Sequence, residues 1–492
     1  MIDLIAESAG LFGPANFIID GERTFSFNEI NVKATYLARI LKYKYNISRG
    51  DYTIIVSDNN LEFILLIFAL WKTGSVPVPL NIKLNAKEIE SLLTFLSPRF
   101  IYIDPNITFH PPAYSVAIKK DVLFSEDNLL YEKIKWPFDA IIPDLFSQNE
   151  TALILFTSGS SGKPKGVELT FNNLRKSFGN SNSVLNQSNK DRWLASLPFY
   201  HIGGFSIIIR TLLSGASIVL SPSLTTEDLA AEIKSRKPSL ISFVSTQLKR
   251  FLEAGIYPNK ILRCVLLGGG YIDDGLILQA LENKWPVAKS YGSTETSSLI
   301  TFLSCKIEKD KISSAGKPLN NNQIFIVDEK KNILPPNSKG EIAVKGESCS
   351  VRYFNNPEET NNKFLDGIYY TGDHGFIDED GYLFVEARRD DLIVSGGENV
   401  NPLEIEKVIK EFPGIINVSV FGEEDKEWGH IISAAVKIDP IKDFSTEMLK
   451  EYLLTKISSF KIPKKFYVVD EFPLSPLGKV LKDKLMEIIR KQ

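Results

Sequence analysis

A glycine- and hydroxyl-rich segment has the composition of an anion-binding loop. It follows the apolar run 153–156 and reads Thr157-Ser158-Gly159-Ser160-Ser161-Gly162-Lys163-Pro164-Lys165-Gly166. Glycines let the backbone approach an anion closely, hydroxyl and N–H groups donate hydrogen bonds, and Lys163 and Lys165 supply charge for a polyphosphate. A Walker A loop is excluded, because its lysine precedes serine or threonine whereas Lys163 precedes Pro164. Composition alone leaves a flexible surface turn as an equal alternative.

A second group combines an aromatic ring, hydroxyl groups and a carboxylate, and it reads Tyr291-Gly292-Ser293-Thr294-Glu295-Thr296. A carboxylate beside a nucleotide can hold Mg²⁺, which prefers oxygen ligands. The alternative is structural, because Ser293 or Thr294 could equally cap a following helix.

Glycines and a carboxylate mark two further candidate segments. Gly268-Gly269-Gly270 ends the expected strand 262–267, and its structural alternative is a plain strand-to-helix turn. Asp373 closes the run Tyr370-Thr371-Gly372-Asp373. An aspartate after a tight turn suits paired hydrogen bonds to ribose hydroxyls, although an aspartate after glycine is usually turn chemistry.

The order of these segments along the whole chain resembles the adenylate-forming superfamily, which contains acyl-CoA synthetases, luciferases and the adenylation domains of peptide synthetases. Ser161 is the departure within the loop, since the superfamily usually has threonine there, and it keeps the hydroxyl. The resemblance implies a ligase that uses ATP, Mg²⁺ and coenzyme A and forms an acyl-AMP.

The same resemblance assigns roles to individual residues. It implies that Thr294 contacts the α-phosphate, that Glu295 binds Mg²⁺ and that Gly268 and Gly292 also line the acyl pocket. The residues that it implies for nucleotide binding are Thr157, Ser158, Gly159, Ser160, Ser161, Gly162, Lys163, Lys165, Gly268, Gly269, Gly270, Tyr291, Gly292, Ser293, Asp373 and Arg388.

Three C-terminal segments extend the resemblance. The run Ala387-Arg388-Arg389-Asp390-Asp391 resembles the hinge of the superfamily, with Ala387 in place of glycine, and Asp390 is the expected pivot. Ser395, Gly396 and Gly397 belong to a loop that is expected to line the pantetheine tunnel. Lys479 follows Gly478 as the adenylation lysine does, although the usual threonine before it is displaced. Its charge would stabilise the transition state at the α-phosphate.

The acid substrate is addressed by residues 197–213. His201 lies in a segment that resembles the acyl-pocket wall, and its structural alternative is a satisfied histidine. Residues 199–206 contain no acidic side chain, which argues against an amino acid as substrate. Arg210 lies in an apolar helical run and needs an anion, because burying an unpaired guanidinium is costly. That anion is either a carboxylate of the chain or a second carboxylate of the substrate.

The surroundings of Arg210, the 266–270 turn and the 390–402 segment most resemble the o-succinylbenzoate–CoA ligase family of menaquinone biosynthesis. Ser245-Thr246 departs from the proline–threonine pair of many relatives. Three alternatives stay open. They are a generic aryl- or medium/long-chain fatty acyl-CoA synthetase, a ligase acting on a carrier protein, and a catalytically silent nucleotide-binding protein of the same fold.

The elements that must position these residues alternate along the first 300 residues, with β-branched runs separated by helical patterns. The expected strands are 53–57, 75–80, 193–196, 217–220, 240–244, 262–267 and 287–290, and the expected helices are 61–72, 205–213, 227–234, 247–253 and 275–282. We therefore predict an α/β fold in which residues 1–388 pack helices on mostly parallel sheets, with a β-rich module from about Val327. Residues 389–492 are predicted to form a small, mobile α+β domain, because 492 residues exceed one hydrophobic core.

Composition limits the partners. The chain has 57 basic and 60 acidic residues, so no net field favours nucleic acid or an anionic membrane. Cys264, Cys305 and Cys349 lack metal or disulfide spacing and fit a reducing compartment. The longest apolar run, 63–71, is far short of the ~20 residues that cross a bilayer. The start of the chain has no basic region of a signal peptide. We expect a cytoplasmic enzyme of small-molecule substrates, for which the sequence allows a homodimer.

Overall fold

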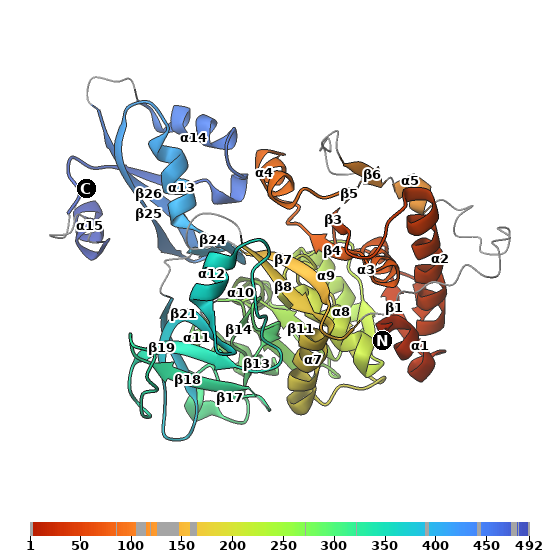
Figure 1. Ribbon diagram of the computed structural model, residues 1–492. Coiled ribbons are helices and arrows are strands. Elements are labelled where there is room, and N and C mark those ends of the chain that lie inside the picture. Colours follow the sequence, from red (N-terminus) through yellow and green to blue (C-terminus); the bar gives the residue numbers. More distant parts are fainter. Residues whose placement is uncertain are drawn as a thin grey trace. The chain divides into compact units, whose positions relative to one another are not determined.

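The chain forms two compact units, one containing most residues up to Ala387 and the other containing Lys83–Phe95 and the residues from Arg388 onward. The computed structural model (Figure 1) describes residues 3–84, 86–104, 115–118, 120–124, 147–157, 165–270, 272–320, 322–388, 393–439, 444–473, 480 and 482–490. The predicted boundary at residue 388 and the mobility of the second domain stay predictions.

A nine-stranded sheet forms the centre of the first unit, in the order β17-β16-β13-β12-β11-β9-β10-β1-β2. The strands from β13 to β1 in this order run parallel. The bounds are β1 Asn16–Asp20, β2 Arg23–Ser26, β9 Arg192–Leu194, β10 Ser217–Val219, β11 Leu240–Phe243, β12 Cys264–Leu267, β13 Val287–Lys289, β16 Thr301–Ser304 and β17 Lys317–Pro318. Their inward residues are β-branched and leucine side chains that are almost wholly buried. The predicted parallel sheet is confirmed.

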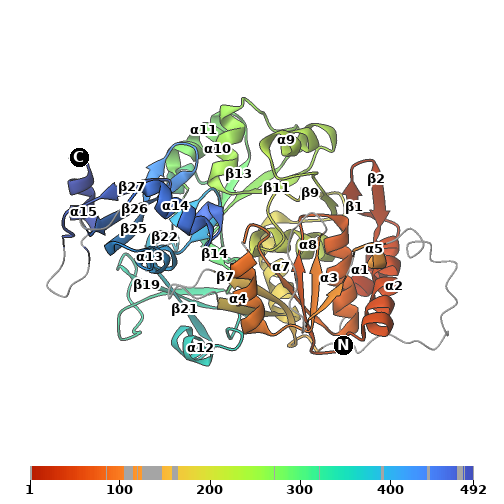
Figure 2. The ribbon, with the colours of Figure 1, turned by 90° about the horizontal axis from the view of Figure 1, so that it is seen from above.

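Helices cover both faces of this sheet, with α9, α10 and α11 along one face and α7 and α8 along the other (Figure 2). Their bounds are α7 Phe171–Leu185, α8 Ile202–Ser214, α9 Thr226–Ser235, α10 Ser245–Glu253 and α11 Asp274–Glu282. Each predicted helix in this region is present. Helix α8 begins three residues before the predicted start, because Gly203 and Gly204 dilute the apolar pattern there.

A four-stranded parallel sheet, ordered β4-β3-β5-β6, belongs to the same unit. The bounds are β3 Tyr52–Val56, β4 Val76–Pro79, β5 Phe100–Ile103 and β6 Val116–Ile118, with helices α1 Leu4–Phe12, α2 Phe27–Tyr45, α3 Leu61–Thr73 and α5 Lys120–Leu123. Helix α4, Ala86–Leu96, lies almost wholly in the segment that belongs to the second unit. Helix α3 starts where the Asn60 side chain accepts from the Phe63 N–H at 2.8 Å and ends at Gly74 with φ +87°. All its residues except Glu62 are buried, as expected for an apolar helix inside a core.

The β-rich module is built on the order β18-β19-β21-β20, with β22 also paired to β21. The bounds are β18 Gln323–Val327, β19 Gly340–Lys345, α12 Pro357–Lys363, β20 Phe364–Leu365, β21 Ile368–Ile377 and β22 Leu383–Arg388. Two hairpins complete the unit, namely β7 Thr151–Thr157 with β8 Lys165–Thr170 and β14 Gly292–Ser293 with β15 Ser298–Leu299. The predicted β-rich module is confirmed, and it begins slightly earlier than Val327.

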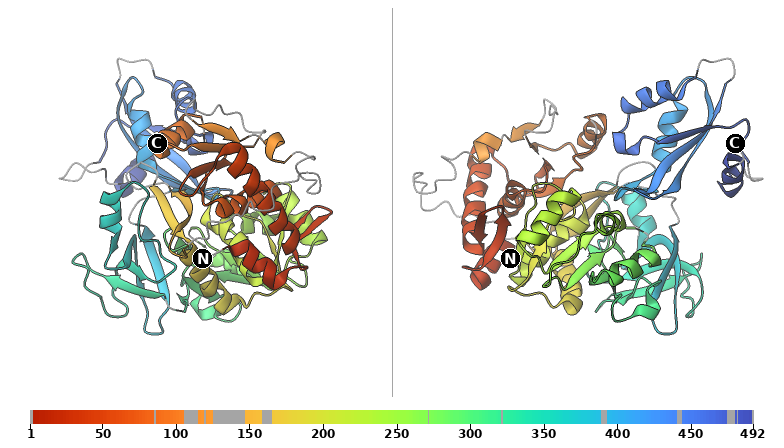
Figure 3. Two further views of the ribbon diagram at one scale, coloured as in Figure 1. Left: turned by 45° about the vertical axis from the view of Figure 1, so that its right-hand side comes forward. Right: turned by 180° about the vertical axis from the view of Figure 1, so that it is seen from behind.

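The second unit has a five-stranded sheet, in which β25 and β26 form a long antiparallel hairpin (Figure 3). The bounds are β23 Ile393–Ser395, β24 Glu398–Val400, α13 Pro402–Lys410, β25 Ile415–Asp425, β26 Gly429–Ile438, α14 Thr446–Leu454, β27 Lys465–Val468 and α15 Lys482–Ile489. Apolar side chains of α13, α14 and the sheet make one core. The predicted α+β character is confirmed.

One expectation in this unit is wrong in detail. Residues 395–400 do not form a loop, because β23 and β24 pair as a hairpin whose turn is Gly396-Gly397. Both glycines have positive φ, +58° and +86°, as a two-residue hairpin turn of this kind requires. No helix in the described part of the chain is long and apolar enough to span a membrane.

Candidate functional site

The predicted site residues follow the carboxyl ends of the parallel strands in the nine-stranded sheet. Gly268 directly follows β12, Tyr291 comes one residue after the end of β13, and the predicted wall segment 197–204 comes shortly after β9. In open α/β sheets, ligands bind outside the carboxyl ends of the strands. The topology therefore gathers these segments, which are far apart in the sequence, at one edge of the sheet.

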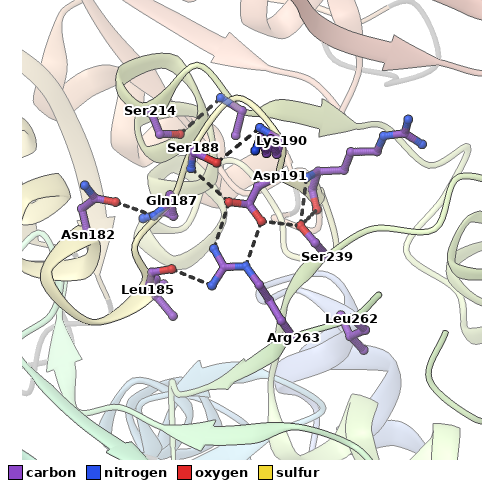
Figure 4. Close-up of polar contacts among 12 residues, drawn as sticks. Asn182, Leu185, Gln187, Ser188, Lys190, Asp191, Ser214, Ser239, Leu262 and Arg263 are labelled. Carbon is purple, nitrogen blue, oxygen red and sulfur yellow. Dashed lines mark hydrogen bonds and ion pairs between the residues drawn. The ribbon is translucent and has the colours of Figure 1, made fainter. Parts of the chain in front are cut away.

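The opposite edge carries a polar cluster of structural character, shown in Figure 4. The carboxylate of Asp191 accepts from Arg263 at 2.8 and 2.9 Å and from the Ser239 hydroxyl at 2.7 Å. Each of these residues immediately precedes a strand, namely β9, β11 or β12. The cluster ties together the amino ends of three parallel strands. It therefore belongs to the scaffold and lies away from the candidate site.

Two predicted nucleotide residues are brought together by a direct hydrogen bond. The Tyr291 hydroxyl donates to Asp373 Oδ2 at 2.7 Å, and the two residues are 82 positions apart. Tyr291 follows β13, whereas Asp373 lies in β21 of the β-rich module. An aromatic ring and a carboxylate in contact are suited to a nucleoside, with the ring beside the base and the carboxylate at the ribose hydroxyls.

Asp373 does not follow a tight turn, so that detail of the expectation is wrong. It lies inside β21, where Glu341 pairs with His374 and Ala343 with Tyr370, so one residue of β19 stands opposite three of β21. Gly372 takes φ +83° in this irregular stretch, and its N–H donates to Glu341 at 3.0 Å. A bulge of this kind bends a strand and re-aims a side chain, which is common beside active sites.

The segment that carries Thr294 and Glu295 is a strained turn between β14 and β15. Ser297 and Ser298 have φ of +55° and +96°, a region that non-glycine residues avoid. Strand β15 follows this turn rather than a helix, so the capping alternative for Ser293 and Thr294 is wrong. Gly292 is required, because a Cβ there would lie 1.9 Å from the Ser298 carbonyl oxygen.

Buried hydrogen bonds hold this turn in its strained form. The Ser177 hydroxyl of α7 donates to the Ser297 carbonyl at 2.5 Å, and the Ser297 hydroxyl donates to the Ser348 carbonyl at 2.7 Å. The Ser293 hydroxyl is buried, with no hydrogen-bond partner among the described residues. A buried hydroxyl of this kind is suited to a ligand, because leaving it unpaired is costly.

Glu295 is 8% exposed and is held at two points. Its Oε1 accepts from the Tyr353 hydroxyl at 2.9 Å, and its carbonyl oxygen accepts from the Ser350 N–H at 2.6 Å. The other carboxylate oxygen accepts no hydrogen bond from the described residues. No group of three or more His, Cys, Asp or Glu side chains in the described chain could hold a metal ion. A single carboxylate nevertheless fits Mg²⁺ beside a nucleotide, because this ion keeps several waters and binds through one or two carboxylates together with phosphates.

Lys165, near the end of the predicted phosphate loop, is the first residue of β8 and is paired with Glu359. The Lys165 ammonium also lies 5.7 Å from the centre of the Tyr353 ring. Its charge is therefore compensated within the chain, and its role at a phosphate stays a prediction.

The glycine segment 268–270 follows β12 as predicted. Gly269 has φ +84°, and a Cβ on Gly268 would lie 2.9 Å from the Ser290 hydroxyl oxygen. The segment therefore packs closely on the strand that leads to Tyr291. This close approach is compatible with a role in the pocket wall, which stays a prediction.

His201 is the N-cap residue of α8, and its side chain makes no capping hydrogen bond. Its ring lies 4.7 Å from that of Tyr200 in an edge-on arrangement. The preceding turn is held by Asn59, whose amide donates to the Leu197 carbonyl and accepts from the Phe199 N–H, both at 2.8 Å. Sequence reasoning missed Asn59, because nothing in its local sequence indicates a partner 138 residues away.

Arg210 is 1% exposed on α8. Its Nη2 donates to the Ser298 hydroxyl at 3.1 Å, and its guanidinium lies 5.2 Å from the centre of the Trp193 ring. Its Nε is buried without a hydrogen-bond partner, and no carboxylate of the described residues pairs with it. Burial lowers the pKa of Arg210 to about 9, which leaves it charged at neutral pH. The first alternative for Arg210, a carboxylate of the chain, is therefore not found among the described residues.

Several predicted residues lie outside the described residues, namely Ser158, Gly159, Ser160, Ser161, Gly162, Lys163, Asp390 and Lys479, and the side chain of Arg388 is likewise not described. Thr157 is the last residue of β7. Ser395 belongs to the second unit and pairs with Gly429, while the Gly396 N–H donates to the Trp428 carbonyl at 3.1 Å. The roles predicted for these residues stay predictions.

Comparison with known proteins gives concordant matches. Residues 5–354 match the family described as AMP-binding enzyme, and residues 404–479 match the AMP-binding enzyme C-terminal domain. A 2-succinylbenzoate–CoA ligase of Bacillus subtilis is 33% identical, over 96% of this chain and 94% of that protein.

Solved structures of o-succinylbenzoate CoA synthetase from Bacillus subtilis are also similar. A double mutant bound with the product analogue OSB-NCoA has a TM-score of 0.91 at 32% identity, covering 99% of this chain and 98% of that one. The complex with the acyl-adenylate intermediate OSB-AMP has a TM-score of 0.74 at 31% identity and the same coverage. The complex with ATP and a magnesium ion has a TM-score of 0.73 at 32% identity, covering 98% and 99%.

Proposed function

The chain belongs to the family of AMP-binding enzymes, and we propose that it is an ATP-dependent ligase that joins 2-succinylbenzoate to coenzyme A through an acyl-AMP. The similarity to 2-succinylbenzoate–CoA ligases extends over nearly the whole of both chains. Activation as an acyl-adenylate and transfer to coenzyme A follow from that membership. The reaction is a step of menaquinone biosynthesis.

The observation that carries the choice of acid is the environment of Arg210. The substrate has an aromatic carboxylate and a succinyl carboxylate, and the carboxylate that does not react must be held. A buried guanidinium with an unpaired Nε supplies the cation that such a carboxylate needs, and a bidentate pair would satisfy both groups. A monocarboxylic fatty acid would leave this charge uncompensated, which disfavours a generic acyl-CoA synthetase.

The reaction proceeds in two steps. In the first, an oxygen of the reacting carboxylate attacks the α-phosphorus of ATP, the bond to the bridging oxygen breaks, and pyrophosphate leaves. In the second, the coenzyme A thiol loses its proton and attacks the acyl carbon, and AMP leaves with the electron pair of the mixed anhydride. Thr294 and Lys479 are proposed to bind the α-phosphate, and Tyr291 with Asp373 is proposed to bind the nucleoside. Charge placed at the developing oxyanions lowers the barrier of such transfers.

Glu295 is the residue that would hold Mg²⁺ with the nucleotide phosphates. The ion neutralises phosphate charge when bound. The protein contributes an oriented carboxylate and a turn whose strained geometry is already formed. His201 is proposed to lie at the carboxylate and thiol side of the acyl pocket, and the hairpin 393–400 is proposed to line the path of the pantetheine arm.

A panel of acids tests the proposal. Pyrophosphate release and thioester formation are measured with 2-succinylbenzoate, benzoate, medium-chain and long-chain fatty acids, with free coenzyme A as the only acceptor. We expect 2-succinylbenzoate to have a kcat/KM at least about tenfold above every other acid, which corresponds to ~1.4 kcal/mol. Equal use of a fatty acid would refute the substrate. Pyrophosphate release without any thioester would refute coenzyme A as acceptor.

The proposal also includes a cytoplasmic location and a homodimer. Cytoplasmic location is tested by cell fractionation, and a homodimer by light scattering on the purified protein. A mass of one chain at micromolar concentration would refute the dimer.

A further inference from the structure

The connection between β19 and α12, residues 346–356, reaches Glu295 from a part of the chain that no nucleotide motif includes. It holds the main chain of Glu295 through the Ser350 N–H at 2.6 Å and the side chain through the Tyr353 hydroxyl at 2.9 Å. A residue that is fixed at both its backbone and its carboxylate has little freedom to change rotamer. Glu295 is therefore presented in one orientation before any ligand binds.

Tyr353 is itself firmly placed. It is 4% exposed, its ring centre lies 5.3 Å from that of Phe364, and its N–H donates to the Thr360 hydroxyl at 3.0 Å. It also forms an isolated antiparallel bridge with Val167 of β8. The main chain of Tyr353 is thus paired with the strand that follows the predicted phosphate loop.

The contact between the Tyr353 hydroxyl and the Glu295 carboxylate is attractive and can therefore orient the carboxylate. The Tyr353 hydroxyl donates a hydrogen bond to Glu295 Oε1 at 2.9 Å. A hydrogen bond from a neutral donor to a charged acceptor is stronger than one between neutral groups. Only one oxygen of Glu295 is used, which leaves the other for a metal ion.

We propose that Tyr353 is a positioning residue for the magnesium carboxylate, because its hydroxyl holds one oxygen of Glu295 and thereby presents the second oxygen to the Mg²⁺ of bound Mg·ATP. This inference rests on the proposed function, in which Glu295 binds that ion. Tyr353 touches neither the nucleotide nor the acid in this scheme. Its effect is confined to the affinity and placement of the metal.

The test uses Tyr353→Phe, which removes the hydroxyl and keeps the ring contacts with Phe364. Tyr102→Phe is the matched control, because Tyr102 is a buried tyrosine whose hydroxyl has no hydrogen-bond partner among the described residues. Mn²⁺ binding to each full-length protein is measured by electron paramagnetic resonance with a non-hydrolysable ATP analogue. The Mg²⁺ dependence of pyrophosphate release is measured in parallel.

We expect Tyr353→Phe to weaken Mn²⁺ binding about 5- to 10-fold and to raise the Mg²⁺ concentration for half-maximal rate by the same factor. Excess Mg²⁺ should restore kcat, and KM for the acid should not change. Tyr102→Phe should match the wild type in both assays. A Tyr353→Phe protein with unchanged metal affinity would overturn the inference, whether or not its melting temperature falls.

Glu295→Gln and the double variant separate this inference from the proposed function. If Glu295→Gln binds Mn²⁺ as the wild type does, the metal role of Glu295 is wrong and the inference falls with it. If Glu295→Gln loses the metal while Tyr353→Phe keeps it, only the positioning role is wrong. If the inference holds, adding Tyr353→Phe to Glu295→Gln weakens metal binding no further, whereas independent roles would give additive losses.

Discussion

Replacing Arg210 by methionine tests whether a buried charge is kept for the substrate or for the fold. Methionine has a similar length and no charge, so the change removes the hydrogen bond to Ser298 and the contact with Trp193. These losses amount to ~0.5–1.5 kcal/mol and ~0.5–2 kcal/mol respectively. The substitution also removes a guanidinium that is 1% exposed and lacks a partner at Nε. Burying such a charge costs several kcal/mol of desolvation, and this cost disappears in the variant. We expect the free protein to be about as stable as the wild type, or more so.

The affinity for 2-succinylbenzoate, in contrast to the stability, should fall. Truncating one partner of a buried, hydrogen-bonded charge pair costs about 2–5 kcal/mol, which is about 30-fold to a few thousandfold in affinity. We therefore expect Arg210→Met to raise KM for 2-succinylbenzoate by at least about 30-fold. An analogue in which a methyl group replaces the carboxylate that does not react should bind wild type and variant equally. KM for ATP should not change.

The assays are urea unfolding without ligands and initial rates of pyrophosphate release with both acids. Arg263→Met is the matched control, because Arg263 pairs bidentately with Asp191 and has no role at the carboxyl edge of the sheet. Since the Arg263 side chain is 39% exposed, solvent screening reduces its contribution, and we expect a loss of about 1–2 kcal/mol with no change in acid preference. If Arg210→Met loses ~3 kcal/mol or more of stability and weakens both acids equally, Arg210 is structural and the reasoning is refuted.

Three further outcomes are expected, the first from the resemblance of the segment around Lys479 and the other two from the structure. Lys479→Ala should abolish acyl-AMP formation yet keep thioester formation from supplied acyl-AMP, as followed by single half-reaction assays; equal loss of both would show that Lys479 is not the adenylation lysine. Gly292→Ala should lower the free energy of unfolding by at least ~2 kcal/mol and remove activity, because its Cβ would lie 1.9 Å from the Ser298 carbonyl oxygen; a stable, active variant in urea unfolding would contradict this. Burial alone would raise the pKa of Asp191, but hydrogen bonds from Arg263 and neighbouring donors hold it below the usual value. The stabilisation is therefore present above the unfolded pKa of about 3.9 and is lost as pH falls through the lower folded value, so Asp191→Asn should flatten the decline of unfolding free energy below pH ~5, and an unchanged slope would refute it.

The sheets and helices of the first unit could be predicted from the sequence because each depends on a local pattern of apolar residues. The local pattern predicts the conformation of apolar runs such as the strand Cys264–Leu267 and the helix Leu61–Thr73. The alternation of strands with helices in turn predicts parallel pairing. Details failed where conformation depends on a distant neighbour. The bulge around Asp373 exists because Glu341 and Ala343 pair across it, and the 393–400 hairpin needs its own cross-strand register.

The chemistry of the candidate site divides in the same way. The sequence by itself determined which residue types are available and in which order they occur, because each motif is a short run whose hydroxyls, glycines and charges adjoin one another. Only the tertiary structure decided which of them share a contact. Tyr291 meets Asp373 across 82 positions, and Glu295 meets Tyr353 across 58. Arg210 could be read from sequence as needing an anion, but whether the chain supplies one depends on every element packed around α8. Side-chain partners across sheets and helices are set by long-range packing, which no local pattern encodes.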